Sequence, residues 1–254
     1  MQTVGETIKD LVGWMDHVEG QGPDWRKSRD EALAVLDRIQ QGQLGSHTAP
    51  LIAECDRNLF RLPGPILLVD FETTGLDPYL NDICEFCAAV VTEHLVFLEK
   101  ENCVVRPVSG HRDPAAMKIH GLTEPMLSRG LDPSSMLDRI DALAKTSQTP
   151  LALASWGVDF DEAFLKAAYD KAERDYPLGY RKFDVRSAVV FHLSQKGIAP
   201  GWGGVASCMK ALGMEFKGEQ HTALNDVVNA LAVLRRCAGF DDRYKGKTLG
   251  RAHE

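Results

Sequence analysis

Hydrophobic positions change their spacing once along the chain, and this change separates a helical region from an α/β region. Near the N-terminus, apolar residues such as Val4, Ile8 and Leu11 recur every three or four positions, which is the spacing of an amphipathic helix. A Pro-Gly-Pro turn signal at residues 63–65 closes this region. We expect residues 1–61 to form an N-terminal helical extension of two or three helices. A cap packed on the main domain is favoured over a separate binding module.

Short apolar runs then alternate with helical patterns from residue 62 to residue 240. Strands that follow one another directly, and are then followed by strands interleaved with helices, are typical of an α/β fold with a mixed β-sheet flanked by helices. The polar segment 241–254 is expected to be a loose C-terminal tail. The predicted strands are Ile66 to Phe71, Ile83 to Thr92, Val96 to Val105 and Leu151 to Ser155, and the predicted helices are 133–145, 160–174, 185–194, 204–212 and 222–238.

Composition adds limits to this picture. The 254 residues are 44% hydrophobic, which suffices for one core, and the formal net charge is -7. This acidic balance does not by itself indicate a nucleic-acid partner. Two bound divalent cations would neutralise four of these seven negative charges around a carboxylate site. An acidic chain is therefore compatible with a metal-dependent enzyme.

The cysteines and the N-terminus indicate where the protein works. The six cysteines are scattered and form no short disulfide framework, which favours a reducing compartment. Cys84 and Cys87 have metal-like spacing, but residues three apart on a strand face opposite sides, so we expect them in the core. No basic leader followed by an apolar run and no apolar stretch of roughly 20 residues is found. We expect a soluble, cytoplasmic protein without a membrane partner.

Two carboxylates interrupt the first apolar strand at Asp70 and Glu72. Side chains two positions apart on a strand point to the same face, so both acids should project together from the sheet. A strand end that faces water would explain either acid alone. The run after them, Thr73-Thr74-Gly75, offers hydroxyl groups, backbone N–H groups and a glycine that lets a ligand come close to the backbone. This combination favours a binding site.

A second acidic position follows the fourth predicted strand, where Ser155-Trp156-Gly157 leads into a helix. Asp161 falls in the first turn of that helix, where the helix dipole favours a negative charge. An acid at a helix start is ordinary, and Asp159 competes for the same role or serves as the N-cap. From the residues alone, both carboxylates stay candidates.

A third group surrounds the start of the last predicted helix. Asp226 stands among apolar neighbours on a face that should be buried, and a buried acid needs a partner or a metal ion. His221 is five residues earlier, and five residues turn an ideal helix by about 140°. The two side chains would therefore diverge if both residues were helical. We expect His221 on the loop or first turn, made mobile by Gly218, where its imidazole can reach a substrate beside Asp226.

These three groups together resemble the motifs of the DnaQ-like, or DEDDh, 3′ to 5′ exonucleases, a family of the ribonuclease-H-like superfamily. The resemblance covers roughly residues 62 to 238. Motifs that occur together in the right order and spacing are far rarer by chance than any one of them. The motifs are Asp70-Phe71-Glu72-Thr73-Thr74-Gly75-Leu76, Phe160-Asp161 with Phe164-Leu165, and His221-Thr222-Ala223 with Asp226.

The resemblance implies a ribonuclease-H-like fold and hydrolysis of phosphodiester bonds from the 3′ end of single-stranded DNA or RNA, with release of 5′ nucleoside monophosphates. It selects Asp161 over Asp159, because the family's acid follows a Phe and precedes an apolar pair. It also implies two divalent cations, Mg²⁺ or Mn²⁺, which prefer oxygen ligands. An imidazole, with an ordinary pKa near 6.5, suits a general base at neutral pH. The implied metal ligands are Asp70, Glu72, Asp161 and Asp226, and the implied general base is His221.

The same resemblance implies contacts with the terminal nucleotides. Leu76 corresponds to an apolar wedge between the last bases, and the segment from His120 to Thr123 to one that packs beside the terminal nucleotide. Thr73, Thr74 and Gly75 complete the implied substrate-binding residues.

Partners and physiological role are left open by the sequence. The expected partner is nucleic acid with a free 3′ end, and a homodimer or a larger assembly is compatible with the chain. One departure from many relatives is Trp156-Gly157-Val158 in place of His-Asn-Ala. In this respect Ser155-Trp156-Gly157 resembles a sub-branch of the family that contains RNA trimmers. Two alternative functions are a non-catalytic nucleic-acid-binding or regulatory protein, and a proofreading or trimming subunit docked on a larger assembly through residues 1–61.

Overall fold

The computed structural model describes residues 61–201 and 203–239. The chain divides into two compact units, Met1–Leu59 and Phe60–Glu254. The predicted helical extension, apart from its last residue, and the predicted polar tail lie outside the described residues and stay predictions. Within the described part of the chain, no helix combines the length and the apolar character that crossing a bilayer requires.

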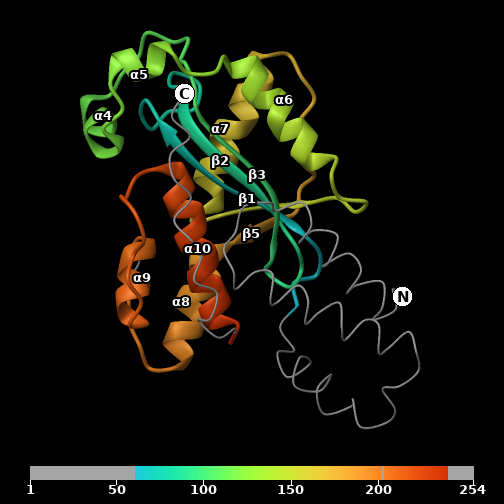
Figure 1. The fold of residues 1–254 in the computed structure, drawn as a ribbon, viewed down its shortest axis with the longest axis vertical. Coiled ribbons are helices and arrows are strands. Elements are labelled where there is room, and N and C mark those ends of the chain that lie inside the picture. Colours follow the sequence, from blue (N-terminus) through green and yellow to red (C-terminus); the bar gives the residue numbers. More distant parts are fainter. Residues whose placement is uncertain (1–60, 202, 240–254) are drawn as a thin grey trace, which may run out of the picture. The chain divides into compact units, whose positions relative to one another are not determined.

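One mixed sheet of five strands forms the centre of the second unit (Figure 1). In chain order the strands are β1 (Ile66–Thr73), β2 (Ile83–Val91), β3 (Phe97–Val104), β4 (Ala152–Ser155) and β5 (Lys182–Asp184). Their order in the sheet is β3-β2-β1-β4-β5. β1, β2 and β3 pair antiparallel because short connections join them, whereas β4 and β5 add in parallel after helical crossovers. The predicted mixed sheet of an α/β fold is confirmed.

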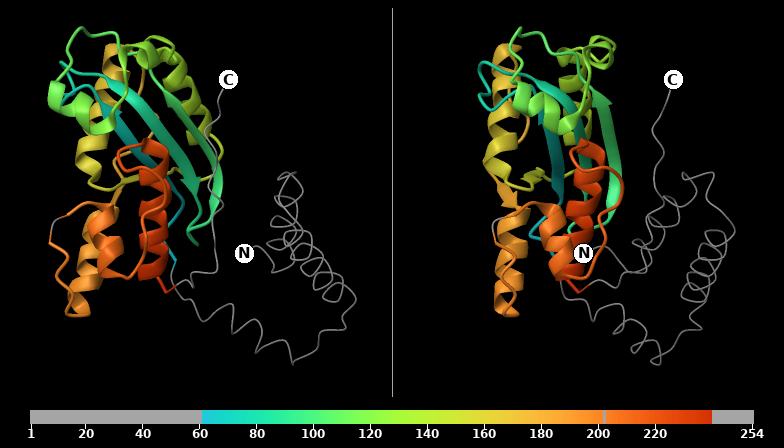
Figure 2. Two further views of the ribbon diagram at one scale, coloured as in Figure 1. Left: turned by 60° about the vertical axis from the view of Figure 1, so that its left-hand side comes forward. Right: turned by 90° about the vertical axis from the view of Figure 1, so that its left-hand side faces the viewer.

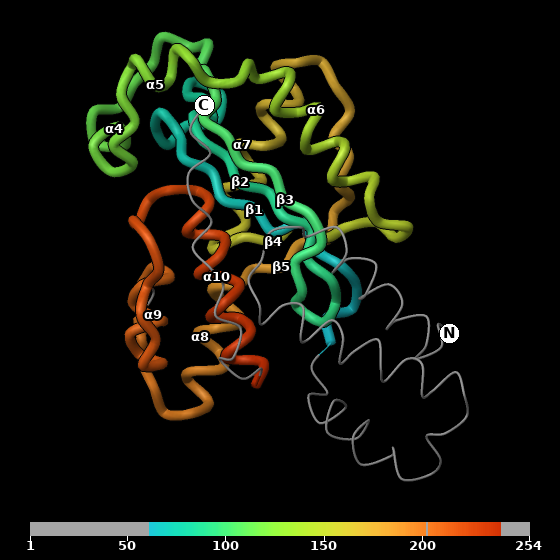
Figure 3. The backbone as a smooth tube through the Cα atoms, viewed as in Figure 1, coloured from blue at the N-terminus to red at the C-terminus, as the bar shows by residue number. Residues whose placement is uncertain are grey.

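Helices cover both faces of this sheet and the end where β1 finishes. In chain order they are α4 (Pro114–His120), α5 (Glu124–Ser128), α6 (Pro133–Ala144), α7 (Val158–Lys171), α8 (Val185–Gln195), α9 (Val205–Ala211) and α10 (Ala223–Cys237). α8, α9 and α10 pack on one face and α6 and α7 on the other (Figure 2). α4 and α5 lie near the end of β1 (Figure 3). Short helices and loops therefore surround the end of the sheet where β1 finishes.

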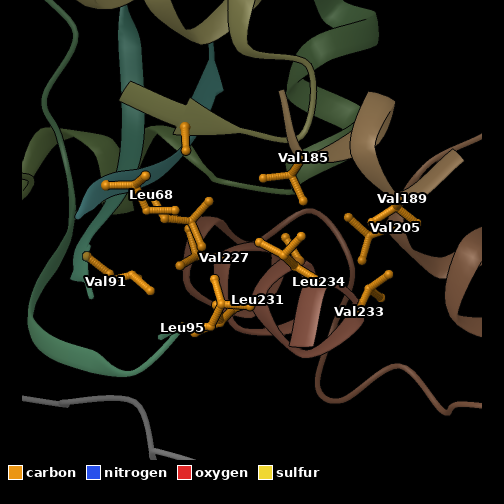
Figure 4. Close-up of a cluster of buried hydrophobic side chains, with 14 of the residues drawn as sticks. Leu68, Val91, Leu95, Val185, Val189, Val205, Val227, Leu231, Val233 and Leu234 are labelled. Atoms are coloured by element: carbon orange, nitrogen blue, oxygen red, sulfur yellow. The ribbon is translucent and has the colours of Figure 1, made fainter. Parts of the chain in front are cut away.

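Alternation along β1 decides which side chains meet which helices. Ile66 and Leu68 belong to the core cluster that includes α10, and Figure 4 shows Leu68 close to Val227 of that helix. Leu67 and Val69 belong to the opposite cluster, beneath α6 and α7. Burying each such side chain contributes roughly 1.5–3 kcal/mol, and a slip of one residue would turn all of them to the wrong face. The alternation of apolar side chains therefore fixes the register of β1, and this register determines the face on which Asp70 and Glu72 lie.

Some element boundaries differ from the sequence prediction. β1 continues two residues beyond the predicted Phe71, because its ladder with β2 includes Glu72 opposite Glu85 and Thr73 opposite Ile83. α7 begins at Val158 and ends at Lys171, so the predicted 160–174 is shifted toward the N-terminus. Three elements were not predicted: α4, α5 and β5. They have 7, 5 and 3 residues, which is too short to show a period.

The cysteines behave as core residues. Cys84 and Cys87 are free and fully buried, and they belong to different core clusters. The expectation that both cysteines lie in the core is confirmed. The pairing of β1 with β2 shifts register at Cys84, so the simple alternation of faces does not extend to this residue.

Candidate active site

β1 presents Asp70 and Glu72 on the face that carries α10. Both side chains are partly buried, and their neighbours across the antiparallel ladder are Cys87 and Glu85. On the other side of β1, the pairing with β4 stops at Leu68. Beyond that point no strand among residues 61–201 and 203–239 pairs with this edge of β1, so another group can approach it. The start of α7 occupies this place.

Asp161 fills the position beside that open edge. Its Oδ1 accepts a hydrogen bond from the backbone N–H of Phe71 at 3.2 Å, and its Oδ2 accepts one from the Ser155 hydroxyl at 2.6 Å. Gly157, with a left-handed φ of 104°, turns the chain from β4 into α7. Asp161 lies in the first turn of α7, as predicted, and its side chain is buried. Asp159 instead pairs with Lys182 at 2.7 Å and its side chain is 90% exposed.

α10 brings the third motif to the same place. Its first residue is Ala223 and its N-cap is Thr222, so His221 lies outside the helix, with a left-handed φ of 60°. The expectation that His221 sits on the loop before the helix is confirmed. Its backbone N–H donates to Oδ2 of Asp226 at 2.9 Å. Candidate ligand atoms of Glu72, His221 and Asp226 all lie within 4.8 Å of one another.

Burial and mutual repulsion raise the pKa values of these four carboxyl groups, so without a cation they ionise less readily than ordinary carboxyl groups. Burial raises the pKa of Asp70 well above its usual value, and the negative charges of Asp161 and Asp226 raise it further. Burial, and after it the charges of Asp226 and Glu85, raise the pKa of Glu72 to about 8. Burial also raises the pKa of Asp161 to about 7 and that of Asp226 above its usual value. A cluster of crowded carboxylate oxygens of this kind fits hard divalent cations.

In the turn after β1, polar groups of Thr73 and Thr74 form hydrogen bonds with other groups of the protein. The Thr73 hydroxyl donates to the carbonyl of Gly75 at 2.7 Å, and the Thr74 hydroxyl accepts from the backbone N–H of Asp82 at 3.0 Å. A Cβ on Gly75 would come within 2.5 Å of the Asn81 side chain. Close packing against Asn81 therefore explains this glycine. The roles predicted for these residues in substrate binding stay predictions.

Leu76 and His120 differ sharply in accessibility. Leu76 is 76% exposed and free to meet a ligand, whereas His120 is only 9% exposed. The imidazole Nδ1 of His120 accepts from the Leu122 backbone N–H at 3.1 Å, and its Nε2 lies 3.6 Å from the Cys84 sulfur. Burial lowers the pKa of His120, and the nearby His221 lowers it further. These contacts give His120 a place in the packing beside the site, and its predicted contact with substrate stays a prediction.

Glu85 is a site residue that the sequence prediction missed. It is partly buried on β2 directly opposite Glu72, and its Oε2 accepts a hydrogen bond from the backbone N–H of Ala223 at 3.2 Å. Its charge also raises the pKa values of Asp70 and Glu72. The available signal was a single carboxylate inside an otherwise apolar strand.

Comparison with known proteins identifies the family. A family model described as exonuclease, RNase_T, matches residues 67–234. A DNA polymerase III of the PolC type from Mycoplasmopsis pulmonis is 28% identical over 103 residues, which are 41% of this chain and 7% of that polymerase. The chain therefore corresponds to a small part of that relative.

Solved structures share the fold. The zinc-bound complex of Escherichia coli exonuclease I with single-stranded DNA aligns with a TM-score of 0.59 at 22% identity, covering 69% of this chain and 41% of exonuclease I. The nuclease domain of 3′hExo, described as a DEDDh family member bound to rAMP, aligns with a TM-score of 0.56 at 20% identity, covering 68% of this chain and 90% of that domain. These alignments confirm the ribonuclease-H-like fold. Given the family match and the three motifs, this chain belongs to the DnaQ-like exonucleases of the RNase_T family.

Proposed function

We propose that this chain is a metal-dependent 3′ to 5′ exonuclease that removes 5′ nucleoside monophosphates from the end of single-stranded DNA or RNA. The observation that carries the proposal is the convergence of four carboxylates and one imidazole at the end of β1. The carboxylates come from β1, α7 and the first turn of α10, and the imidazole comes from the loop before α10. The catalytic residues in this proposal are Asp70, Glu72, Asp161, Asp226 and His221.

The carboxylates would hold two divalent cations, Mg²⁺ or Mn²⁺, because their oxygens are the ligands these cations prefer. When bound, the cations neutralise the phosphoryl oxygens and stabilise the departing 3′ oxygen. His221 is the general base in this proposal. Its side chain is exposed, and its backbone is held by Asp226. An imidazole placed beside the metal ligands can take the proton of the attacking water.

Action at the end of a strand is supported by the surroundings of the site, and the 3′ polarity in this proposal rests on the resemblance of the motifs. Leu76 is exposed on the turn that follows the two acids of β1, where an apolar side chain can insert next to the last base. Exonuclease I, which shares the fold, binds a dT13 oligonucleotide. A single-stranded oligonucleotide is likewise the substrate proposed here.

The test is a degradation assay on matched 5′-labelled single-stranded DNA and RNA oligonucleotides. We expect a ladder of shortened labelled strands with Mg²⁺ or Mn²⁺, none with a chelator, and 5′ nucleoside monophosphates as products by mass spectrometry. A closed single-stranded circle should survive. The rates on the two oligonucleotides decide the preference between DNA and RNA.

A pair of variants in one helical turn provides the control. Asp161→Asn should abolish degradation, whereas Asp159→Asn should retain it, because Asp159 is exposed and paired with Lys182 away from the cluster. Nicking of the circle, or degradation in chelator, would contradict the proposal. A folded protein that binds the oligonucleotides without cleaving them would instead support a binding or regulatory role.

A trimming or proofreading subunit of a larger assembly is the second candidate. The observation that favours it is the similarity to part of a PolC-type DNA polymerase III. A pull-down with the full chain and with a chain lacking residues 1–60 tests it. Partners that are retained only by the full chain would support docking through the predicted helical extension.

A further inference from the structure

We propose that Glu85 is a positioning residue that holds the start of α10, and with it His221, against the metal ligands. This inference rests on the proposed nuclease function and adds a residue outside the family motifs quoted above. The juxtaposition that carries it is the hydrogen bond from Ala223 at the start of α10 to Glu85 on β2.

The N-terminus of α10 lacks a cap from its own N-cap residue. The Thr222 hydroxyl makes no capping hydrogen bond and donates instead to the carbonyl of Glu219 at 3.2 Å. The first backbone N–H groups of a helix have no partner within the helix and need an acceptor from elsewhere. For Ala223 that acceptor is Glu85, which is 138 residues away in the sequence. The sheet therefore caps this helix through a side chain.

Two carboxylates hold the segment that carries the imidazole. Asp226 accepts from the N–H of His221, and Glu85 accepts from the N–H of Ala223. His221 has a left-handed φ of 60°, a conformation that costs energy in a residue with a side chain and needs support from its surroundings. If the hydrogen bond from Ala223 to Glu85 is lost, the hydrogen bond from His221 to Asp226 is the one of these two contacts that remains. The imidazole would then sample positions away from Glu72.

A carboxylate at position 85 destabilises the sheet unless another contact, such as the one with the start of α10, compensates for it. It lies directly opposite Glu72 in the antiparallel ladder, and like charges in this relation destabilise a sheet. An apolar side chain at this position would continue the buried run of β2 and remove the repulsion. A charged acceptor that reaches a helix N-terminus offsets the repulsion, because the helix dipole favours a negative charge there.

Two conservative variants separate the hydrogen bond from the charge. Glu85→Gln keeps an acceptor oxygen at the same reach and removes the charge, whereas Glu85→Asp keeps the charge and shortens the side chain by one methylene. If Glu85 positions His221, Glu85→Asp should lower kcat by about 10- to 100-fold, the scale expected for a misplaced catalytic group. Glu85→Gln should retain more turnover than Glu85→Asp. Glu99→Gln, on the exposed part of β3, is the matched control.

Two further measurements show whether Glu85 acts through His221. The affinity for Mn²⁺ alone, measured by calorimetry on the full chain, should be nearly unchanged in Glu85→Asp. In a His221→Ala background, Glu85→Asp should have little further effect on kcat, because residues that act as one unit are not additive. Thermal melting of each variant separates lost stability from lost positioning.

The outcomes are distinct. A wild-type chain that degrades no oligonucleotide would contradict the proposed nuclease function itself. An active wild type in which Glu85→Asp outperforms Glu85→Gln would overturn only this inference, because the charge and not the hydrogen bond would then matter. Additive losses in the double variant, or weakened Mn²⁺ binding by Glu85→Asp, would overturn it as well.

Discussion

The backbone N–H of Phe71 donates to the carboxylate of Asp161, 3.2 Å away in space and 90 residues later in the sequence. This bond forms because β4 pairs with β1 only as far as Leu68 and leaves the next part of the β1 edge to the first turn of α7. The Ser155 hydroxyl completes the arrangement from the last residue of β4. The Asp161 carboxylate of α7 is thereby added to the acidic side chains that β1 presents.

Removal of the Ser155 hydroxyl should weaken metal binding most at low pH. Burial raises the pKa of Asp161, the hydrogen bonds from Ser155 and Phe71 lower it, and the balance of these effects places it at about 7. A hydrogen bond to a charged group contributes roughly 1.5–3 kcal/mol, so Ser155→Ala should raise that pKa by about one to two units. Protons then compete better with Mn²⁺, and calorimetry should show a larger loss of affinity at pH near 6.5 than at pH near 8.5. Equal losses at both pH values would contradict this, and Ser147→Ala, on an exposed loop, is the control.

Replacement of His221 should slow the chemical step and spare the metal ions. If the imidazole is the general base, His221→Ala lowers kcat by roughly 10² to 10⁴, and the acidic limb of the pH profile disappears. Mn²⁺ affinity should change little, because the four carboxylates remain. A large loss of Mn²⁺ affinity would instead make His221 a metal ligand, an arrangement that its proximity to Glu72 and Asp226 allows. His94→Ala, at an exposed turn, is the matched control.

Neutralising one acid should stabilise the metal-free protein, in a way that depends on pH. Burial and neighbouring charges raise the pKa of Asp70 above its usual value. A carboxyl group with a raised folded-state pKa holds its proton in the folded protein at pH values where the unfolded chain has already lost it. The resulting loss of stability is absent below pH of about 4, grows as the pH rises toward the folded-state pKa and stays constant above it. In chelator, Asp70→Asn should therefore melt a few degrees above the wild type at pH 8 and at the same temperature at pH near 4.

Two results would contradict this prediction. A lower melting temperature of Asp70→Asn at pH 8 would show that the acid stabilises the fold. A difference that does not change with pH would show that repulsion between the acids is not its cause. Added Mn²⁺ should stabilise the wild type at pH 8 and reverse the order of the two proteins.

Shortening Leu76 should affect substrate binding and leave stability alone. The side chain is 76% exposed, so Leu76→Ala removes little buried surface and should not change Tm. If Leu76 inserts beside the terminal base, the variant should raise KM for a single-stranded oligonucleotide several-fold. Leu80→Ala, at a side chain that is 53% exposed in the following loop, is the control. Equal KM values for the wild type and Leu76→Ala would remove Leu76 from the substrate site.

Much of the site was predictable because its signals are local. An alternating apolar strand determines that Asp70 and Glu72 share a face, and the break between loop and helix determines that His221 precedes α10. Both depend only on neighbours a few residues away. The mixed α/β sheet and the order of its three motifs could likewise be read from the pattern along the chain.

Other features were decided by contacts between distant segments. Asp161 lies in the site because its carboxylate accepts hydrogen bonds from Ser155 and from the edge of β1. Asp159 lies outside the site because its carboxylate forms an ion pair with Lys182 of β5. β5 has three residues, too few to show a period. A local pattern records which side chains are buried but not which partner each one meets. The sequence by itself therefore determined the strand faces and the motifs, whereas only the tertiary structure brought Glu85 to the start of α10, since that hydrogen bond joins groups 138 residues apart.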